Sequence, residues 1–408
     1  MSSENSTITP ELVPHSPVLS VAGSSSTIIT AGTTTPREED LYRAAAAMSS
    51  DRQRAMQSAS SSSTATTAVS SVATGHTVET DLTARDSGSS GGGSGTFAFD
   101  SDMSKYPPSM TSSVRAHVYE GGLRYHAFRD GQYAFPNDEI EQSRDDMKHT
   151  MTLMVTRGEY FYAPVGKALE AGGVVLDLGT GTGIWAIELG DKYPKAHITG
   201  IDLSPIQPNF VPENVHFFVD DFEEEWVDPE NKYDFIHCRH TAHSIKNSKL
   251  LLQRVLRHLK PGGFFEIADL YFVPQCDDET MTPDTPYALR DFMNYINAGM
   301  RVLGSDLRGI ISATDEMKAA GFENVETIQH KIPIGLWPRD KRLRLAGLFL
   351  RTAMMDGLRG ISRRPLLALG WTQLQIEMFL VDVRKAIMDA KFHTYLTYYA
   401  VHGRKPLS

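Results

Sequence analysis

The sequence predicts an α/β protein built on a doubly wound parallel sheet, and two observations support this fold class. From residue 174 onwards, short runs rich in β-branched and aromatic residues alternate with stretches of helical periodicity. The first of these runs ends in a glycine-rich turn that leads directly into a helix. Strands that alternate with helices form parallel sheets covered on both faces, with right-handed connections.

The expected core strands are short and rich in residues that favour buried strands. Five of them are predicted at 174–179 (VVLDLG), 197–202 (HITGID), 215–220 (VHFFVD), 233–238 (YDFIHC) and 263–269 (GFFEIAD). Helices are predicted between them at 184–194 and 247–263, and the second helix ends at Pro261 and Gly262.

The C-terminal third of the chain completes the predicted sheet. A helix at 314–322 leads into a sixth strand at 324–330, and the β-branched and aromatic run at 395–403 predicts a seventh. Residues 338–392 predict a mostly helical insertion before this last strand. Within it, Thr372 and Gln375 have the spacing of a capping box.

The first 100 residues have a different composition. Ser, Thr, Ala and Gly make up 57 of them, and only three are aromatic, although the whole chain has 18 Phe, 15 Tyr and 4 Trp. So few large apolar side chains cannot bury enough surface to offset the entropy of ordering the segment. We therefore expect a disordered arm at 1–105 with a short helix at 36–48, an N-terminal helical or lid segment at 106–172, and a core domain at 173–408.

Composition argues against several classes of protein. The chain has no run of 18 apolar residues, and its N-terminus lacks the basic and apolar regions of a secretory signal, so no membrane insertion is expected. Cys238 and Cys276 are the two cysteines, which excludes a disulfide framework and indicates a reducing compartment. The net charge of −10 gives no electrostatic support for direct binding to nucleic acid.

The glycine-rich turn at 179–183 (GTGTG) predicts a cofactor site. Nicotinamide and flavin enzymes use a similar turn to bind a pyrophosphate. Asp177, two residues before the first glycine, would oppose a pyrophosphate and suits an ammonium group. Asp202 ends the next strand, where a carboxylate can accept hydrogen bonds from both ribose hydroxyls. Asp220 and Asp221 end the third strand, within reach of an adenine amino group.

These features together predict S-adenosylmethionine, an adenosine that carries an amino acid and no phosphates. A nicotinamide cofactor is one alternative. A purely structural glycine turn, in which Asp177 and Asp202 only cap loops, is another.

The motifs resemble those of class I S-adenosylmethionine-dependent methyltransferases. LDLGTGTG, GIDLS, VDDFEEEW, YDFIHCRH and LKPGGFFEIAD occur in this order. The chain is more similar still to the fungal LaeA-type methyltransferases, which regulate secondary metabolism and development. This likeness rests on YHAFRDGQYAFPNDEIEQSR (125–144), GTGIWAIELGDKYP (181–194), DLSPIQP (202–208) and the final YLTYYAVHGRKP. The resemblance covers roughly residues 119–406.

The resemblance implies a seven-stranded Rossmann-like sheet with an antiparallel last strand. It also implies contacts with the cofactor. Asp177 would contact the amino group, and Gly179, Gly181 and Gly183 would line the methionine part. Asp202 would hold the ribose, Asp220 or Asp221 the adenine amino group, and Phe222 or Ile201 would pack on the adenine ring. Thr180, Leu203 and Arg239 belong to the same expected set. Many LaeA-type relatives carry Cys where this chain has Thr180, and both side chains are small.

Methyl transfer from a sulfonium is an in-line displacement that needs alignment and, at most, a base for the acceptor's proton. His240 and Tyr125 are the predicted catalytic residues, and His126, His243 and Glu266 are further candidates for the base. Neither a Pro-Pro-Tyr-type motif nor an acidic cluster with metal-ligand spacing follows the fourth strand, so the acceptor is not identified and no metal is expected. Residues 125–144 either close over the cofactor as a lid or cap the sheet edge.

Three functions are compatible with the sequence. The LaeA resemblance implies a methyltransferase in a regulatory complex, with velvet-type regulators or other methyltransferase subunits as partners, in the nucleus and cytoplasm. A biosynthetic enzyme that methylates a small secondary metabolite is the alternative. A binding module without turnover is the third, although such a scaffold has no physical need for the glycines and acids of the site.

Overall fold

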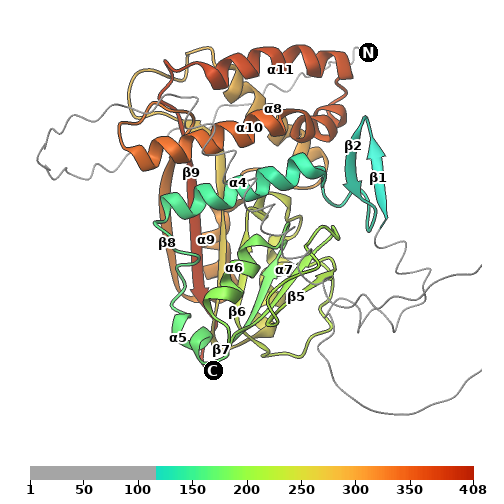
Figure 1. The fold of residues 1–408 in the computed structure, drawn as a ribbon, viewed down its shortest axis with the longest axis vertical. Helices are drawn as coiled ribbons and strands as arrows, with labels where there is room; N and C mark the ends of the chain where they lie inside the picture. The colour runs from blue at the N-terminus through green and yellow to red at the C-terminus, as the bar shows by residue number, and fades with distance from the viewer. Residues whose placement is uncertain (1–115) are drawn as a thin grey trace, which may run out of the picture.

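The computed structural model describes residues 116–408. The predicted arm at 1–105 and its short helix at 36–48 lie outside the described residues. In Figure 1 the described part consists of a sheet with flanking helices and a group of helices at one end of that sheet.

Seven strands form one sheet in the order β5-β4-β3-β6-β7-β9-β8. They are β3 (Val174–Leu178), β4 (His197–Asp202), β5 (Val215–Val219), β6 (Tyr233–Arg239), β7 (Leu259–Gln275), β8 (Glu323–Pro333) and β9 (Tyr395–Arg404). Strands β3 to β7 pair in parallel, whereas β9 is antiparallel to both β7 and β8. The predicted fold class and the antiparallel last strand are confirmed.

Strand β7 is the one whose predicted bounds were much too short. It runs well past 263–269, and its pairing with β9 extends to Gln275 opposite Tyr395. The extension depends on a partner strand more than 100 residues later in the chain, so no local pattern marks it.

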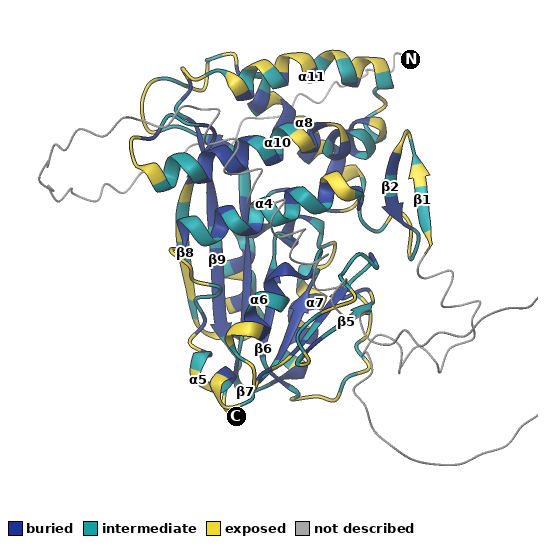
Figure 2. Cartoon of the chain, in the orientation of Figure 1, coloured by how far each residue is buried: buried dark blue, intermediate teal, exposed yellow. Residues whose placement is uncertain are grey.

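Helices cover both faces of the sheet. They are α5 (Gly166–Glu170), α6 (Ile184–Lys192), α7 (Ser248–His258) and α9 (Ala313–Ala320). Val175 and Leu176 are neighbours in β3, yet Val175 packs in a core with Trp185 of α6, whereas Leu176 packs in another with Leu251 of α7 and Met317 of α9. Consecutive strand residues point to opposite faces, so the sheet has a separate core on each side, and its strands are largely buried in Figure 2.

A third core lies beyond the carboxyl ends of the parallel strands. Four helices form it, α4 (Glu139–Val155), α8 (Ala288–Val302), α10 (Lys341–Ala368) and α11 (Gln373–Met388), and we call them the helical cap. Helix α10 packs against each of the other three. The predicted helical insertion at 338–392 is thus confirmed as α10 and α11, and the capping box of Thr372 and Gln375 is present.

The hairpin of β1 (His117–Glu120) and β2 (Leu123–His126) was not predicted. Its strands have four residues each, too few for a recognisable pattern. Tertiary contacts hold the hairpin in place, because Arg364 of α10 donates a hydrogen bond to Glu120 (2.8 Å) and lies 3.9 Å from the ring centre of Tyr125. Helix α8 and the short 3-10 helices η2 (Ala242–Ser244) and η3 (Gly309–Ser312) were also not predicted.

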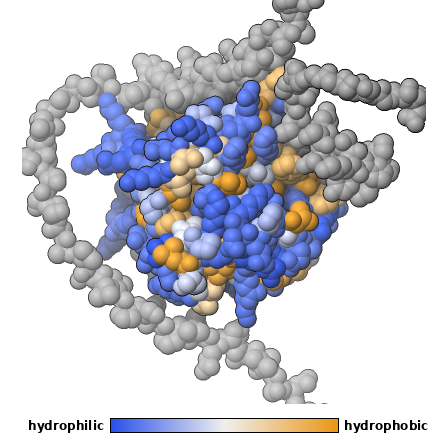
Figure 3. All heavy atoms as spheres, turned by 90° about the horizontal axis from the view of Figure 1, so that it is seen from below, coloured by the Kyte–Doolittle hydropathy of each residue, from blue (hydrophilic) through white to orange (hydrophobic). Residues whose placement is uncertain are grey.

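The end of the molecule opposite α10 and α11 is largely hydrophilic in Figure 3, with hydrophobic side chains in small separate groups. Of the helices in residues 116–408, none is both long and apolar enough to cross a membrane.

Close contact between α8 and α10 shapes the helical cap. Gly299 of α8 faces Pro365 of α10, and a Cβ at Gly299 would lie only 2.2 Å from the Pro365 carbonyl oxygen. A backbone oxygen cannot rotate away, so any side chain at residue 299 must push the two helices apart.

We therefore expect Gly299→Ala to lower the free energy of unfolding by about 1–3 kcal/mol, the usual cost of overpacking. Replacing glycine with alanine inside a helix normally stabilises it by about 1 kcal/mol, so a net loss of stability would be due to the contact with Pro365. Urea unfolding of the full chain measures the change. Ala298→Ser, at an exposed position of the same helix, should change stability by less than about 0.5 kcal/mol. A more stable Gly299→Ala variant would contradict the proposed contact.

Candidate functional site

A cavity opens at the carboxyl ends of β3, β4, β5 and β6, where the following loops meet α4 and the segment before it. Ligands of open α/β sheets bind at this edge. The cavity is strongly acidic, because its lining includes six carboxylates and one guanidinium, from Glu141, Asp145, Asp177, Asp202, Asp221, Glu223 and Arg239. Such a lining favours a cationic ligand and disfavours a phosphate.

Two of the three predicted glycines border this cavity. Gly179 and Gly181 line it, together with Thr180, whereas Gly183 does not. Gly183 is instead the N-cap of α6, with a φ of 79°, and a Cβ there would lie 2.4 Å from the ring of Phe217. Both the positive φ and the close contact require glycine at this position, so Gly183 shapes the turn without touching the cavity.

Asp177 lines the cavity and already has partners in the protein. Thr180 Oγ1 donates a hydrogen bond to its Oδ2 (2.6 Å), and His237 Nδ1 lies 2.7 Å from its Oδ1. The His237 ring is stacked on Trp185, with 3.6 Å between ring centres. Asp177, Thr180 and His237 therefore form one rigid polar wall, and sequence reasoning missed the contribution of His237 to it.

Asp202 lies at the end of β4, where two backbone amides hold its carboxylate. The Gly181 amide donates to Oδ2 (2.9 Å) and the Ser204 amide to Oδ1 (2.8 Å), and Leu203 also lines the cavity. Burial raises the pKa of Asp202 to about 6, although the two amides oppose this shift. Hydroxyl groups that donate to this carboxylate would stabilise its charged form.

Asp220 and Asp221 were alternatives in the sequence, and the structure distinguishes their positions. Asp221 is buried and lines the cavity, as does Phe222, whereas Asp220 is exposed and does not. The Glu223 amide donates to Asp221 Oδ1 (3.0 Å), which fixes the carboxylate at the cavity. Ile201, the alternative to Phe222, is not part of the lining.

Arg239 brings a positive charge into this acidic cavity. Its Nη2 lies 2.6 Å from Nδ1 of His149 in α4, while its Nη1 is buried and has no hydrogen-bond partner. Burial lowers the pKa of the Arg239 guanidinium. A buried guanidinium nitrogen without a partner is well suited to bind a carboxylate of a ligand.

His240 lines the cavity in a strained backbone conformation, with a φ of 56°. Its Nε2 lies 3.1 Å from Oγ1 of Thr152, and its Nδ1 lies 3.6 Å from Oδ1 of Asp269. Burial lowers the pKa of His240 to about 4. The imidazole is therefore neutral near pH 7, and its low pKa makes it a weak base.

Tyr125, the other predicted catalytic residue, does not lie at the cavity. It is fully buried in β2, where its ring packs under the guanidinium of Arg364. Burial also raises the pKa of Tyr125 to about 12. The expectation failed because the hairpin that carries Tyr125 packs on α10, a contact that no sequence motif indicates.

The other candidate bases also lie outside this cavity. His126 Nδ1 is bonded to a backbone carbonyl, and Glu266 accepts hydrogen bonds from the amides of Tyr162 (2.7 Å) and Ala163 (2.8 Å). The Nδ1 atom of His243 lies 3.0 Å from Oδ2 of Asp269 in β7. Within residues 116–408, no group of three or more His, Cys, Asp or Glu side chains could hold a metal ion.

Helix α4 and the segment before it form one side of the cavity. Tyr133, Asn137 and Gln142 of the predicted lid segment line it, as do Asp145 and His149 of α4. A further link runs from Thr182 Oγ1, in the glycine turn, to Oδ1 of Asp146 in α4 (2.9 Å). The motif at 125–144 pointed to this segment, whereas Asp145 and His149 carry no signal of their own.

Comparisons with known proteins agree with this geometry. The methyltransferase domain family matches residues 156–327. The methyltransferase pytC of Aspergillus terreus is 37% identical over 300 residues, which cover 73% of this chain and 91% of that protein. The secondary metabolism regulator laeA of Aspergillus niger is 33% identical over 294 residues, covering 70% of this chain and 76% of that protein. The protein-methionine methyltransferase laeA of Emericella nidulans is 32% identical over 292 residues, covering 71% and 76%.

Glu266 makes the stability of the fold depend on pH. Burial raises the pKa of its carboxyl to about 7 from an ordinary value of 4.5, against the effect of the two amides and Arg239. The folded protein therefore keeps a proton that the unfolded chain loses above pH 4.5. The stability that this proton contributes is complete below pH 4.5 and is lost as the pH rises through 7.

We expect Glu266→Gln to remove this loss, because the amide oxygen of Gln can still accept from both backbone amides. The free energy of unfolding of the wild type should fall by about 3 kcal/mol relative to the variant between pH 4.5 and 7.5. Chemical denaturation across this range measures it. Glu279→Gln, at an exposed position, should leave the wild-type profile unchanged. Parallel profiles for the wild type and Glu266→Gln would contradict the raised pKa.

Proposed function

We propose that this chain, which belongs to the LaeA-type family of methyltransferases, takes its methyl group from S-adenosylmethionine bound in the acidic cavity. Three of the six lining carboxylates, Glu141, Asp145 and Asp221, are ion-paired within the protein. The observation that carries the proposal is the remaining set of Asp177, Asp202 and Glu223 together with one unpartnered guanidinium nitrogen. S-adenosylmethionine bears an ammonium and a sulfonium, which suit the carboxylates, and one carboxylate, which suits the guanidinium.

Individual residues match the parts of this ligand. Asp202 would accept hydrogen bonds from the ribose hydroxyls, and Asp221 would accept from the adenine amino group, with Phe222 on the adenine ring. Asp177 would lie near the ammonium group, directly or through water, and Arg239 would bind the carboxylate. The positively charged sulfonium makes the methyl group an electrophile, so the protein has to align the acceptor, exclude water and receive the acceptor's proton.

Calorimetry with S-adenosylmethionine tests the donor site. We expect Asp202→Ala to bind it about 10- to 150-fold more weakly than the wild type, because hydrogen bonds to a charged group contribute about 1.5–3 kcal/mol.

Asp191→Ala is the control, since it also removes one carboxylate but Asp191 is exposed on α6 and does not line the cavity. Its affinity should stay within about twofold of the wild type. Equal affinities of Asp202→Ala and the wild type would refute the ribose role. A melting temperature raised by NADH and not by S-adenosylmethionine would favour an oxidoreductase.

We further propose that the enzyme acts in a regulatory complex that controls secondary metabolism and development through gene expression. The name of the secondary metabolism regulator laeA of Aspergillus niger supports the regulatory role. Velvet-type regulators or other methyltransferase subunits would be the partners, in the nucleus and cytoplasm. The alternative, methylation of one small secondary metabolite, is compatible with the 37% identity to the methyltransferase pytC, whose name mentions no regulatory role.

A double substitution in the native host separates the two alternatives. Gly179→Ala with Gly181→Ala places side chains at two lining positions with positive φ, so we expect loss of S-adenosylmethionine binding. Metabolite profiling should then show loss of many unrelated secondary metabolites if the enzyme is a regulator, and of one methylated compound if it is biosynthetic. Gly158→Ala, where a Cβ meets open space, is the control for a positive-φ glycine. An unchanged profile would contradict both functions.

A further inference from the structure

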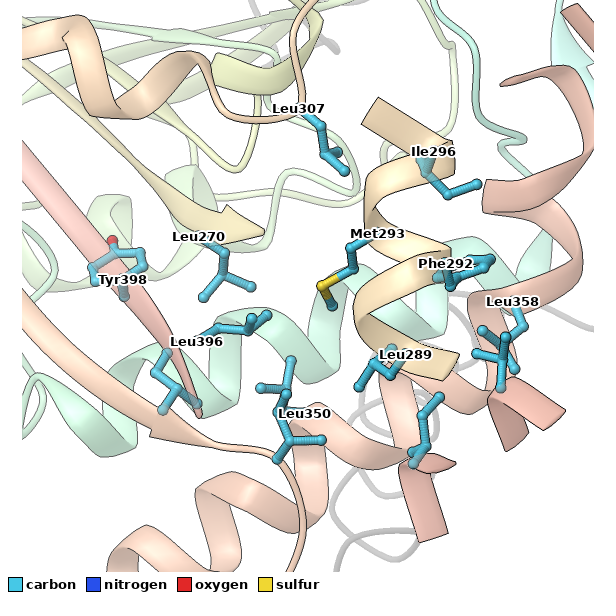
Figure 4. Packing of buried hydrophobic residues seen from close by; sticks show 14 of the residues in the cluster. Leu270, Leu289, Phe292, Met293, Ile296, Leu307, Leu350, Leu358, Leu396 and Tyr398 are labelled. Carbon is cyan, nitrogen blue, oxygen red and sulfur yellow. The ribbon is translucent and has the colours of Figure 1, made fainter. Parts of the chain in front are cut away.

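A second cavity lies beside the first and is bordered largely by apolar side chains. The two cavities share Tyr133 and Glu141. Leu270 of β7, Met293 of α8 and Leu350 of α10 line the second cavity, and Figure 4 shows how these three side chains point toward one another. We call it the cap cavity, because α4, α8 and α10 of the helical cap form most of its wall.

The charged residues of the cap cavity are already paired with protein groups. Arg144 forms an ion pair with Glu141, and Lys148 Nζ lies 2.7 Å from Oδ1 of Asp145. Because these charges compensate one another, the cap cavity has no free charge to bind an ionic ligand. Its occupant should therefore be an uncharged, apolar group.

One polar atom in the wall of the cap cavity has no partner. His243 is buried and sits among the rings of Tyr133, Phe135 and Phe272, at 5.6–6.2 Å between ring centres. Its Nδ1 lies 3.0 Å from Oδ2 of Asp269, while its Nε2 is buried without a hydrogen-bond partner. A buried nitrogen without a partner is costly, and a ligand group that donates a proton would remove that cost.

Asp269 determines the chemical state of this nitrogen. Burial alone would raise the pKa of the Asp269 carboxyl, but His243 and His240 together hold it well below its usual range. The charged carboxylate can accept a hydrogen bond from Nδ1–H of His243, and in this neutral tautomer Nε2 carries a lone pair. Its other oxygen lies 3.6 Å from Nδ1 of His240, which lines the first cavity. The Asp269 carboxylate thus contacts one histidine from the lining of each cavity.

We propose that the cap cavity binds the methyl acceptor, an uncharged aromatic molecule with a hydroxyl group, and that His243 is its general base. This inference rests on the proposed donor site in the first cavity. In the reaction, the acceptor oxygen forms a bond to the methyl carbon while the sulfur–methyl bond breaks and its electron pair remains on sulfur. The hydroxyl proton passes to Nε2 of His243, and the imidazolium is stabilised by Asp269 until solvent takes the proton.

Binding of two probes, 2-naphthol and naphthalene, tests the cavity and the base separately from turnover. They differ only in the hydroxyl group. Fluorescence titration of the full chain should show that the wild type binds 2-naphthol about threefold to tenfold more tightly than naphthalene, the contribution of one hydrogen bond. In His243→Phe, which keeps an aromatic ring but not the nitrogen, the ratio should fall to about one.

Larger side chains in the cap cavity should weaken the binding of both probes. Met354 lines the cap cavity and is half-buried, so Met354→Trp should fold and weaken both probes by about tenfold or more. Leu350→Phe provides a second cavity-filling variant. The affinity for S-adenosylmethionine should stay unchanged in all three variants, because none of the substituted residues lines the first cavity.

Turnover with 2-naphthol completes the test. His243→Phe should lower kcat by about a hundredfold or more while KM changes only severalfold. If His243→Phe leaves the ratio of the 2-naphthol and naphthalene affinities unchanged, His243 is not the base. If both filling variants leave the probe affinities unchanged, the cap cavity does not bind the acceptor. If S-adenosylmethionine fails to bind while the probe results hold, the proposed donor fails and the cap cavity stands as an aromatic-alcohol site.

Discussion

Buried carboxylates at one edge of the sheet constrain the local structure around them. A charged group in the interior is stable only when it is hydrogen-bonded or paired, and here each acid has its own partner. Backbone amides of the turns hold Asp202 and Asp221, Thr180 and His237 hold Asp177, and His243 holds Asp269. The turns after β3, β4 and β5 therefore have to present amides or hydroxyls inward. The same arrangement leaves a negative surface ready for a cationic ligand.

Helix α4 connects the two halves of the molecule. It packs against α10 of the helical cap, and its polar side touches the sheet through Asp146 at the glycine turn, His149 at Arg239 and Thr152 at His240. Both cavities include residues of this helix. A shift of α4 would change the donor cavity and the cap cavity together, because the same helix forms a wall of each.

The sequence predicted the parts of this structure that local patterns determine. Each strand from β3 to β6 has its own apolar run, and the glycine turn, Asp202 and Asp221 follow those strands directly, so their common edge could be inferred from parallel topology. Contacts between distant segments could not be inferred in this way. His149 and Asp145 reach the cavity only because α4 crosses the carboxyl edge, and Tyr125 faces away from it because its hairpin packs on Arg364. Gly183 is an intermediate case. The sequence identified it as part of the glycine turn, but the ring of Phe217, which leaves no room for a side chain there, lies on another strand.

Different parts of the chain line the two cavities, and this difference matters for how an acceptor would be selected. The methyltransferase domain match at 156–327 includes the glycine turn, Asp202, His243 and Asp269. Helix α10 lies outside it and supplies part of the apolar wall of the cap cavity, as do β7 and α8 inside it, whereas α4 contributes only charged residues to this wall. Substitutions in α10 can reshape the cap cavity while the glycine turn, held by its own backbone hydrogen bonds, stays intact. The proposed donor site and base can therefore stay the same while the side chains of α10 that line the cap cavity change the choice of acceptor.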